Sequence, residues 1–469
     1  MAVARAAVRH VPEPYSLVAF LKGITKGLIE NKPYAFLREW HNEHGPLLRV
    51  NMAALKVVSV ADAQTVKWVT RNDPARFTKG PGYDAIKRGW LDNTIVLNED
   101  EEWRRKRTLY TRAFKVAAIR SYVPLFFDIA DAAASQWQRQ HEGQRPVDAV
   151  RSFESVALES IGRAGFGVEG MGESGSRYAH AFTSYLRVLQ DEISSPAMIL
   201  LPRPLREAVT WLRGRHHLSV MNAESLRISE ADSTPDADGP ESGAKETRRN
   251  LVSLIREAAA EEGSGMDPEQ LAREANLFLF AGHDTTSATM AWVFASLASH
   301  PEAQQRAYEE VAAIPAEDLA ERVSDPRSLP FLGAVVKETL RLYPPAAMAL
   351  RRTKFDEQLG GYDIPAGTNL TISIWCLQRD PKVFEDADSF KPERWIDAGQ
   401  EELKSMQDHW LPFMIGARGC IGQHFAMMEM RIVIATLLRR FSVELASAPK
   451  LQQRMLLLPT DILLRCSPR

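Results

Sequence analysis

The sequence predicts a mainly α-helical protein with a minor β-sheet, folded as a single continuous domain over residues 1–469. Two observations support this prediction. Most of the chain places apolar residues at helical spacing, whereas the segments that read as strands are few and short. No internal repeat is visible. The length also matters, because 469 residues can bury roughly three quarters of their unfolded surface, enough to enclose a large cofactor.

The composition excludes several classes of function. A formal charge of −2 and a pI near 6.6 give no general affinity for nucleic acid or for an acidic membrane. Three cysteines are too few for a disulfide framework, so a reducing compartment is expected. The apolar segment Tyr15–Ile29 is interrupted by Lys22 and Lys26, and it is shorter than the roughly 20 residues of a membrane span. We therefore expect a soluble, cytoplasmic monomer without a transmembrane anchor.

The first third of the chain mixes helices with short strands. Pro33–Glu43 reads as a helix with proline in its first turn and apolar residues along one face. Leu47–Val50 and Lys56–Val60 read as two strands of a small sheet. A loop marked by glycine and proline, Lys79–Glu99, precedes a strongly basic helix over Glu101–Phe114.

Helices dominate the rest of the chain. An amphipathic helix is expected over Ile119–Gln140, and further helices over Val150–Ile228 with a break at Pro202 and Pro204. Residues 229–247 are polar, acidic and rich in proline and glycine, which predicts a flexible surface loop. The remaining predicted elements are three helices, Asn250–Glu261, Pro268–Ser299 and Glu302–Ile314, a strand pair, Leu350–Thr353 and Leu370–Ile374, and a last helix, Gln423–Arg440.

Cys420 lies in a segment with three glycines, Phe413–Gly422, which predicts a tight loop. The loop leads directly into the last predicted helix, so Cys420 is near the amino end of that helix. Unpaired N–H groups and the helix dipole favour a thiolate there. One such thiolate can be a nucleophile or the fifth ligand of a haem iron. An iron–sulfur or structural zinc site would need several clustered thiolates or histidines, and a buried free cysteine is the remaining alternative.

Arg418 favours the haem, because its guanidinium can pair with a propionate, and Phe413 can screen the sulfur from water. The spacing Phe-x-x-Gly-x-Arg-x-Cys-x-Gly, which ends at Gly422, resembles the haem-binding signature of the cytochrome P450 family. The resemblance implies heme b (iron protoporphyrin IX) with Cys420 as the axial thiolate, and Phe413, Arg418 and Gly422 as cofactor-binding residues. It also implies the fold of that family, with the haem between the long central helix and the cysteine-loop helix.

The centre of the long helix Pro268–Ser299 reads Ala-Gly-His-Asp-Thr-Thr, an unusual set for a helix interior. The Thr285 hydroxyl can bond the carbonyl one turn back and open a groove there. A groove with an alcohol and a carboxylate suits oxygen that must receive protons. The motif resembles the oxygen-activation sequence of the family, which implies catalytic roles for Asp284 and Thr285. His283 occupies its variable position and can be structural or can touch substrate or water.

Glu338 and Arg341 are three residues apart, so they can pair on one helix face. Exposed, such a pair would contribute only a few tenths of a kcal/mol. The order of motifs resembles the family, in which these two residues and an arginine at the position of Arg394 form a buried structural network under the haem. Where many relatives have His-Arg-Asp-Pro, this chain has glutamine at Gln378, a position that is not among the ligands.

Further residues resemble propionate ligands of the family: Trp103, Arg107 and Arg351. Trp103 and Arg107 share a helix face because they are four residues apart. Of the neighbouring pair Arg351 and Arg352, we expect Arg351 to turn inward. The other basic residues of the helix are then expected to face outward, as a solvated face or as a docking surface for an acidic electron-transfer protein: Arg104, Arg105 and Lys106.

The resemblance implies a haem-thiolate monooxygenase that activates O₂ to hydroxylate or epoxidise a hydrophobic small molecule. No flavin or nicotinamide module is visible, so the electrons would come from a separate ferredoxin-, flavodoxin- or reductase-type donor. The alternatives are a same-fold isomerase, dehydratase or peroxygenase, whose members commonly lack the acid and alcohol, and a non-enzymatic haem sensor. The expected pocket walls are chiefly apolar: Gly80–Val96, Leu186–Leu201, Phe278, Leu279, Ala281, Ala346–Leu350 and Leu456–Leu458.

Overall fold

The computed structural model describes residues 10–13, 16–30, 32, 34–52, 55–80, 83, 91–173, 176–194, 198, 201–231, 250–261, 263, 267–453 and 456–469. The chain separates into two compact units. The first unit contains residues 1–85, 337–420 and 451–453, and the second contains residues 86–336, 421–450 and 454–469. That the two act as the single predicted domain stays a prediction.

The first unit is built on a five-stranded sheet. Its strands are β1 (Leu47–Met52), β2 (Leu55–Val60), β3 (Phe77–Thr78), β5 (Met348–Thr353) and β8 (Asn369–Ser373). They lie in the order β1-β2-β8-β5-β3, with β2 parallel to β8 and the other neighbours antiparallel. Both strand pairs expected from the sequence are therefore confirmed. A separate hairpin joins β6 (Glu357–Leu359) to β7 (Tyr362–Ile364).

The apolar core of the first unit extends from this sheet to the cysteine loop. Val58 and Val60 of β2 and Leu370 and Ile372 of β8 alternate along their strands and are buried in it. Leu411, two residues before the loop begins, belongs to the same core. The position of the loop is thus tied to the sheet through continuous packing.

Short helices complete the first unit. They are α1 (Leu17–Ile29), α2 (Ala35–His44), α3 (Ala63–Asn72), α17 (Ile374–Leu377), α18 (Arg394–Asp397), α19 (Gln400–His409) and the end of α16 (Pro330–Leu342). α3 begins where it does because the Asp62 carboxylate accepts a hydrogen bond from the Thr65 N–H at 2.6 Å. α2 confirms the first predicted helix, although Pro33 lies outside the described residues.

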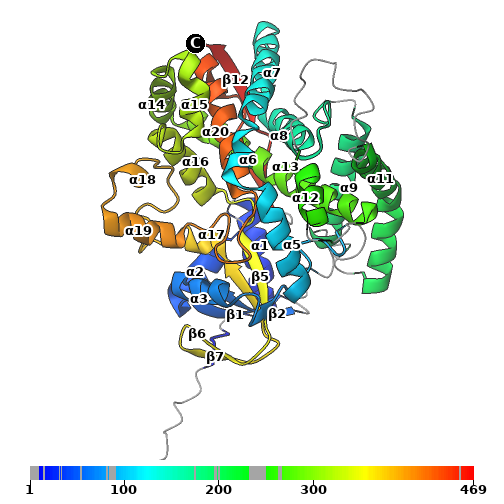
Figure 1. Cartoon of the computed structure of the whole chain (residues 1–469). Helices are drawn as coiled ribbons and strands as arrows, with labels where there is room; N and C mark the ends of the chain where they lie inside the picture. The colour runs from blue at the N-terminus through cyan, green and yellow to red at the C-terminus, as the bar shows by residue number, and fades with distance from the viewer. Residues whose placement is uncertain are drawn as a thin grey trace, which may run out of the picture. The chain divides into compact units, whose positions relative to one another are not determined.

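The second unit is almost entirely helical (Figure 1). Its elements are α5 (Asp100–Ala113), α6 (Val116–Arg120), α7 (Val123–Glu142), α8 (Ala149–Phe166), α9 (Arg177–Ser194), α11 (Arg203–Ala231), α12 (Leu251–Glu261), α13 (Pro268–Ser299), α14 (Pro301–Ala312), η2 (Ala316–Asp318), α15 (Leu319–Ser324), α20 (Gln423–Arg440), β4 (Val147–Asp148), β9 (Phe441–Leu445), β11 (Leu457–Thr460) and β12 (Leu463–Pro468). β10 (Lys450–Gln453) also follows α20 in the chain, and β4, β12 and β9 form a small antiparallel sheet.

α13 is the central element of the second unit. It begins at Pro268, whose missing N–H costs nothing in a first turn, and Asp267 caps it by accepting the Glu269 N–H at 3.3 Å. It packs along α8 (Figure 1), where Phe294 stacks on Phe153 with ring centroids 5.3 Å apart. Trp137 of α7 meets the same two rings edge-on. This aromatic packing joins the carboxyl-terminal half of α13 to α7 and α8.

Most predicted helix limits agree with the structure, and two need correction. The helix expected over Ile119–Gln140 is two helices, α6 and α7, because Pro124 in the first turn of α7 cannot continue a preceding helix. The loop expected over 229–247 does not include residues 229–231, because α11 continues to Ala231. The rest of that segment lies outside the described residues. Among the described helices, none is long and apolar enough to cross a membrane.

Candidate active site

The centre of α13 carries one accessible patch on an otherwise buried helix. Ala281 is exposed and Thr285 is partly exposed, whereas nearly all neighbouring positions are buried. The Thr285 hydroxyl donates to the Ala281 carbonyl at 2.7 Å, as the sequence predicts. A Cβ on Gly282 would lie 3.5 Å from Ile161 of α8, so this glycine sits at the helix–helix contact. The patch therefore presents a small side chain and a hydroxyl.

Asp284 and His283 form a buried pair beside that patch. His283 Nδ1 lies 2.7 Å from Asp284 Oδ1, and both side chains are nearly inaccessible. Burial lowers the pKa of His283, but the hydrogen bond to Asp284, the charges of Asp284 and Glu154 and the Glu154 carbonyl outweigh it, so the pKa is raised. The imidazole is thus poised to hold a proton next to the carboxylate.

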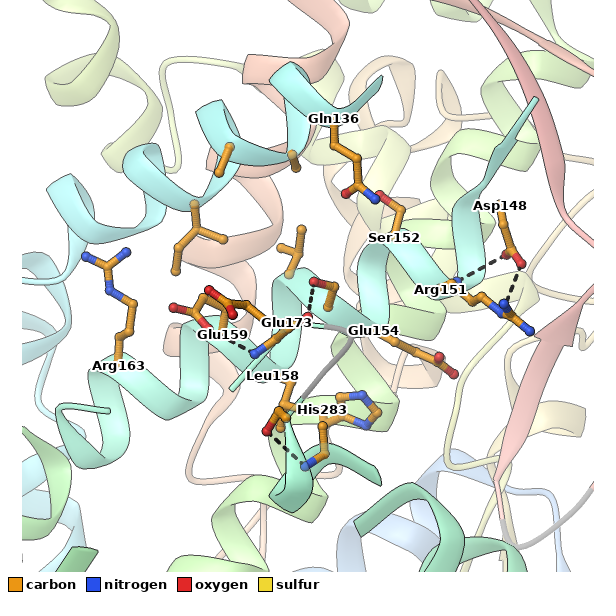
Figure 2. A pocket seen from close by; sticks show the side chains of 18 of the residues that line it. Gln136, Asp148, Arg151, Ser152, Glu154, Leu158, Glu159, Arg163, Glu173 and His283 are labelled. Carbon is orange, nitrogen blue, oxygen red and sulfur yellow. Dashed lines mark hydrogen bonds and ion pairs between the residues drawn. The ribbon is translucent and has the colours of Figure 1, made fainter. Parts of the chain in front are cut away.

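His283, one member of this pair, lines a surface groove of about 960 Å³ (Figure 2). α7, α8 and α9 supply most of its lining, and His283 is the contribution of α13. Figure 2 shows the His283 ring close to Leu158 and near Glu154 of α8. The groove was not predicted from the sequence. α7, α8 and α9 follow one another in the chain, but the space between them depends on how they pack.

The cysteine loop meets α20 as predicted. Gly422 is the N-cap residue of α20, and the Cys420 N–H donates to the Phe413 carbonyl at 2.8 Å, which closes the loop. The left-handed conformation expected of the glycines occurs at Gly416, with φ of 77°, where a Cβ would lie 2.5 Å from the Thr70 carbonyl oxygen. Gly416 is therefore required both by its backbone conformation and by this close approach.

Cys420 differs from the other two cysteines of the chain. Its side chain is exposed, whereas Cys376 and Cys466 are buried and burial raises the pKa of each of their thiols to about 12. A thiol that ionises with such difficulty is a poor metal ligand. Cys420 is thus the cysteine that a metal can reach.

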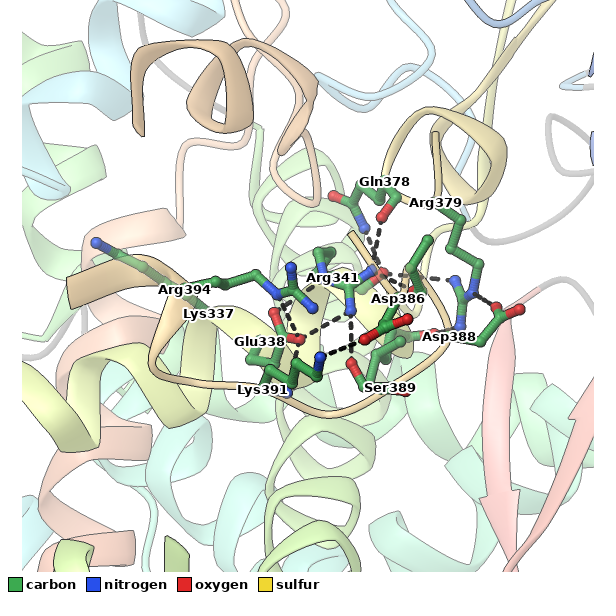
Figure 3. A network of polar contacts seen from close by, with 12 residues as sticks. Lys337, Glu338, Arg341, Gln378, Arg379, Asp386, Asp388, Ser389, Lys391 and Arg394 are labelled. Carbon is green, nitrogen blue, oxygen red and sulfur yellow. Dashed lines mark hydrogen bonds and ion pairs between the residues drawn. The ribbon is translucent and has the colours of Figure 1, made fainter. Parts of the chain in front are cut away.

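Glu338, Arg341 and Arg394 lie together in a buried network (Figure 3). Arg341 donates to both Glu338 oxygens at 2.8 and 2.9 Å, and Arg394 Nε donates at 3.0 Å. The Trp395 indole and the Lys391 N–H add two further hydrogen bonds to the same carboxylate. Burial raises the pKa of Glu338, but its bonds to Arg341 outweigh this, so the pKa is lowered and the carboxylate stays ionised.

Gln378 completes this region in a way that the sequence did not indicate. Its side chain is fully buried and donates to the carbonyls of Leu340 and Arg341 at 2.9 and 3.0 Å, while its oxygen accepts the Leu411 N–H at 2.9 Å. It therefore joins the end of α16 to the segment that enters the cysteine loop. Only the departure from His-Arg-Asp-Pro could have drawn attention to it.

Comparison with known proteins identifies the family. A family model described as "Cytochrome P450" matches residues 10–465, almost the whole chain. The chain belongs to the cytochrome P450 family. Similar proteins include "Cytochrome P450 4F5" of Rattus norvegicus, 30% identical over 76% of this chain and 69% of that protein. "Leukotriene-B4 omega-hydroxylase 3" of Mus musculus is 28% identical over 90% and 79%, and "Cyclooctat-9-en-7-ol 5-monooxygenase" of Streptomyces melanosporofaciens 28% over 85% and 82%.

Membership in the cytochrome P450 family establishes the coarse chemistry. The protein is an oxidoreductase that incorporates molecular oxygen, a monooxygenase, and it has the mainly α-helical P450 fold. Its cofactor is heme b with a cysteine thiolate ligand, and it needs O₂ and a redox partner.

The described residues fit a haem-thiolate cofactor. In the first unit, Cys420 is exposed at the amino end of a helix rather than buried. In the second unit, the accessible patch of α13 has the small Ala281 next to the Thr285 hydroxyl. The side chain of Ala281 is a single methyl group, so it leaves the space beside the hydroxyl open.

Three of the predicted propionate ligands of this P450 lie on two elements, and the fourth, Arg418, is a half-buried residue of the cysteine loop. In β5, Arg351 is buried and its Nε donates to Asp73 Oδ2 at 2.7 Å, whereas Arg352 is exposed and donates to the Gly367 carbonyl. Arg351 is thus the member of the pair that turns inward, but its guanidinium already has an acidic partner. Trp103 is buried on α5, and Arg107, one turn later, is partly exposed.

The outward orientation predicted for the basic residues of α5 is wrong for Lys106. Its side chain is 1% exposed, its Nζ lies 3.1 Å from Glu274 Oε1 of α13, and it also donates to the Asn93 carbonyl. The reason is spacing, because Lys106 is three residues after the buried Trp103 and so lies on the same face. Arg104 and Arg105 are exposed as predicted, and each pairs with a glutamate one turn earlier.

Proposed function

We propose that Cys420 provides the thiolate that binds the haem iron of this monooxygenase. The observation that carries the proposal is the contrast among the three cysteines, of which Cys420 is the exposed one, at the amino end of α20. Its position suits a thiolate, since the first turn of a helix presents unpaired N–H groups and the positive end of the dipole. Phe413 and Gly422 shape the loop around it.

The proposal extends to the groups that hold the porphyrin. Arg418, Arg107, Arg351 and Trp103 are the candidate partners of the two propionates. Arg351 is buried next to Asp73, so Asp73 would orient its Nε. Its Nη1 donates to the Leu350 carbonyl. Glu338, Arg341 and Arg394 have a structural role in this scheme: their network, with Gln378, supports the segment that enters the cysteine loop.

Asp284 and Thr285 are proposed as the catalytic pair. Haem, when bound, supplies the reduction of O₂ and the transfer of one oxygen atom to the substrate. The Thr285 hydroxyl stands on the accessible face of α13 and is fixed by its bond to Ala281, so it can donate to oxygen at one defined position. Asp284, one residue earlier, can hold a proton and pass it to that hydroxyl.

The substrate proposed is a hydrophobic small molecule that is hydroxylated or epoxidised. Two of the similar proteins are named as a leukotriene-B4 omega-hydroxylase and a cyclooctat-9-en-7-ol 5-monooxygenase, which supports a small organic molecule as substrate. A ferredoxin-, flavodoxin- or reductase-type protein is proposed as the electron donor, and the exposed Arg104 and Arg105 suit an acidic one. The protein is proposed to be a monomer.

Spectroscopy of the reduced protein under carbon monoxide tests the ligand. The strongly red-shifted Soret band of thiolate ligation is expected for the wild type and for Cys466→Ala, and it should be absent from Cys420→Ala. A Cys420→Ala variant that keeps the band would overturn the assignment. Product formation with NADPH and a surrogate reductase, compared with peroxide alone, then separates a monooxygenase from a peroxygenase.

A further inference from the structure

His283 connects the buried Asp284 to the groove between α7, α8 and α9. It lines that groove (Figure 2). Its Nδ1 lies 2.7 Å from Asp284 Oδ1. Within the part of the chain that the structure describes, no other side chain hydrogen-bonds the Asp284 carboxylate. The His283 imidazole is therefore the side chain that links the Asp284 carboxylate to the groove.

The charged groups around the ring favour its protonated form. Asp284 acts on it from its own helix and Glu154 from α8, whereas α9 places the uncharged Phe182 ring edge-on, with centroids 5.5 Å apart. Arg187 of α9 and Asp148 before α8 act on Glu154. Two acids thus face one largely buried imidazole, and an imidazolium balances them better than a neutral ring.

We propose that His283 is a positioning residue that orients Asp284 and returns a proton to it from water in the groove. The inference rests on the proposed catalytic role of Asp284 and adds the side from which its protons come. An imidazole can do this because it holds one proton while it exchanges another, and its charge changes near neutral pH.

The proton transfer balances without any co-reactant other than water. The starting pair is the His283 imidazolium and the Asp284 carboxylate. The Nδ1–H bond breaks as an O–H bond forms at Asp284 Oδ1, and Asp284 then gives this proton to the Thr285 side and is again a carboxylate. The neutral ring takes a proton that groove water carries in from the solvent as hydronium, which is left as water, and the starting pair is restored. A residue with only a structural role would hold the same hydrogen bond but would need neither titration nor access to water.

Deuterium exchange at the imidazole C2 position, read by mass spectrometry of peptides, tests access and titration directly in the intact holoprotein. The native ring should exchange within about tenfold of the rate of His180, which also lines the groove, although the His283 side chain is 1% exposed. The pKa of His283 should lie above its ordinary value of 6.5 and should be lower in the Asp284→Asn variant. Thr183→Phe, which adds bulk to the groove wall, should slow the exchange. Full protection of His283 in the native protein would overturn the proposal.

A kinetic test completes the argument, with dodecanoic acid as the probe substrate. In His283→Gln, product per NADPH should fall roughly tenfold and the pH profile should flatten between pH 6 and 8. His180→Gln is the matched control and should change neither. If Asp284→Asn impairs coupling and His283→Gln behaves like the control, the inference fails and the proposed function stands. If Asp284→Asn and Thr285→Ala also leave coupling unchanged, both the inference and the proposed function fail. If dodecanoic acid is not turned over, the exchange experiment decides, and full protection of native His283 overturns the inference.

Discussion

Two buried acids in this protein have opposite surroundings. Glu338, in the first unit, accepts five hydrogen bonds from four residues and is completely inaccessible. Asp284, in the second unit, has one imidazole as its side-chain partner and lies behind a groove. A fully satisfied carboxylate cannot exchange a proton without breaking its network, whereas a carboxylate with one titratable partner can. The difference separates an acid that holds structure from an acid suited to chemistry.

The largest expected effect comes from Glu338→Gln. This change leaves the buried Arg341 and the partly buried Arg394 without their counter-charge, so the free energy of unfolding should fall by about 3–5 kcal/mol, or the protein should fail to accumulate in folded form. Urea denaturation followed by circular dichroism measures it. The matched control is Glu402→Gln or Glu102→Gln at the surface, where the change should stay within about 0.5 kcal/mol. An equal effect at both sites would mean that the network adds nothing to stability.

Lys106→Met should have the next largest effect. It removes the cation beside Glu274, whose pKa is already raised by burial although Lys106 opposes this. We expect a loss of about 2–4 kcal/mol, because an unpaired carboxylate would remain in a dry site. The double variant Lys106→Met, Glu274→Leu should recover most of that loss, and Arg104→Met on the exposed face is the control. A single variant as stable as the wild type would show that Glu274 is neutral in the folded protein.

The sequence predicted the elements better than the contacts between them. α13 and α20 begin and end at the predicted residues, because a proline and a glycine mark their starts in the local sequence. The outward prediction for Lys106 was wrong because Lys106 lies three residues after Trp103 and therefore shares its buried helix face. Gln378 was passed over because its partners are 33 to 38 residues away, at positions that only the fold brings near. The groove likewise depends on the packing of α7, α8 and α9.

The smallest expected effect concerns the dependence of stability on pH, and it tests the contrast between the two acids. The pKa of His283 is raised in the folded protein, so its contribution to stability is complete below the ordinary value near 6.5 and is lost as pH rises through the folded pKa. The difference in unfolding free energy between wild type and His283→Gln should therefore shrink with rising pH, by about 1.4 kcal/mol for each unit of pKa shift. Comparing the two proteins at each pH removes the shared contributions of other buried acids such as Glu429, whose pKa is raised to about 8 by burial. Glu338→Asp, in contrast, should give a difference that stays constant over the same range, since that carboxylate remains ionised throughout. A difference between wild type and His283→Gln that does not vary with pH would mean that His283 is neutral beside Asp284 and that the two acids differ less than their contacts suggest.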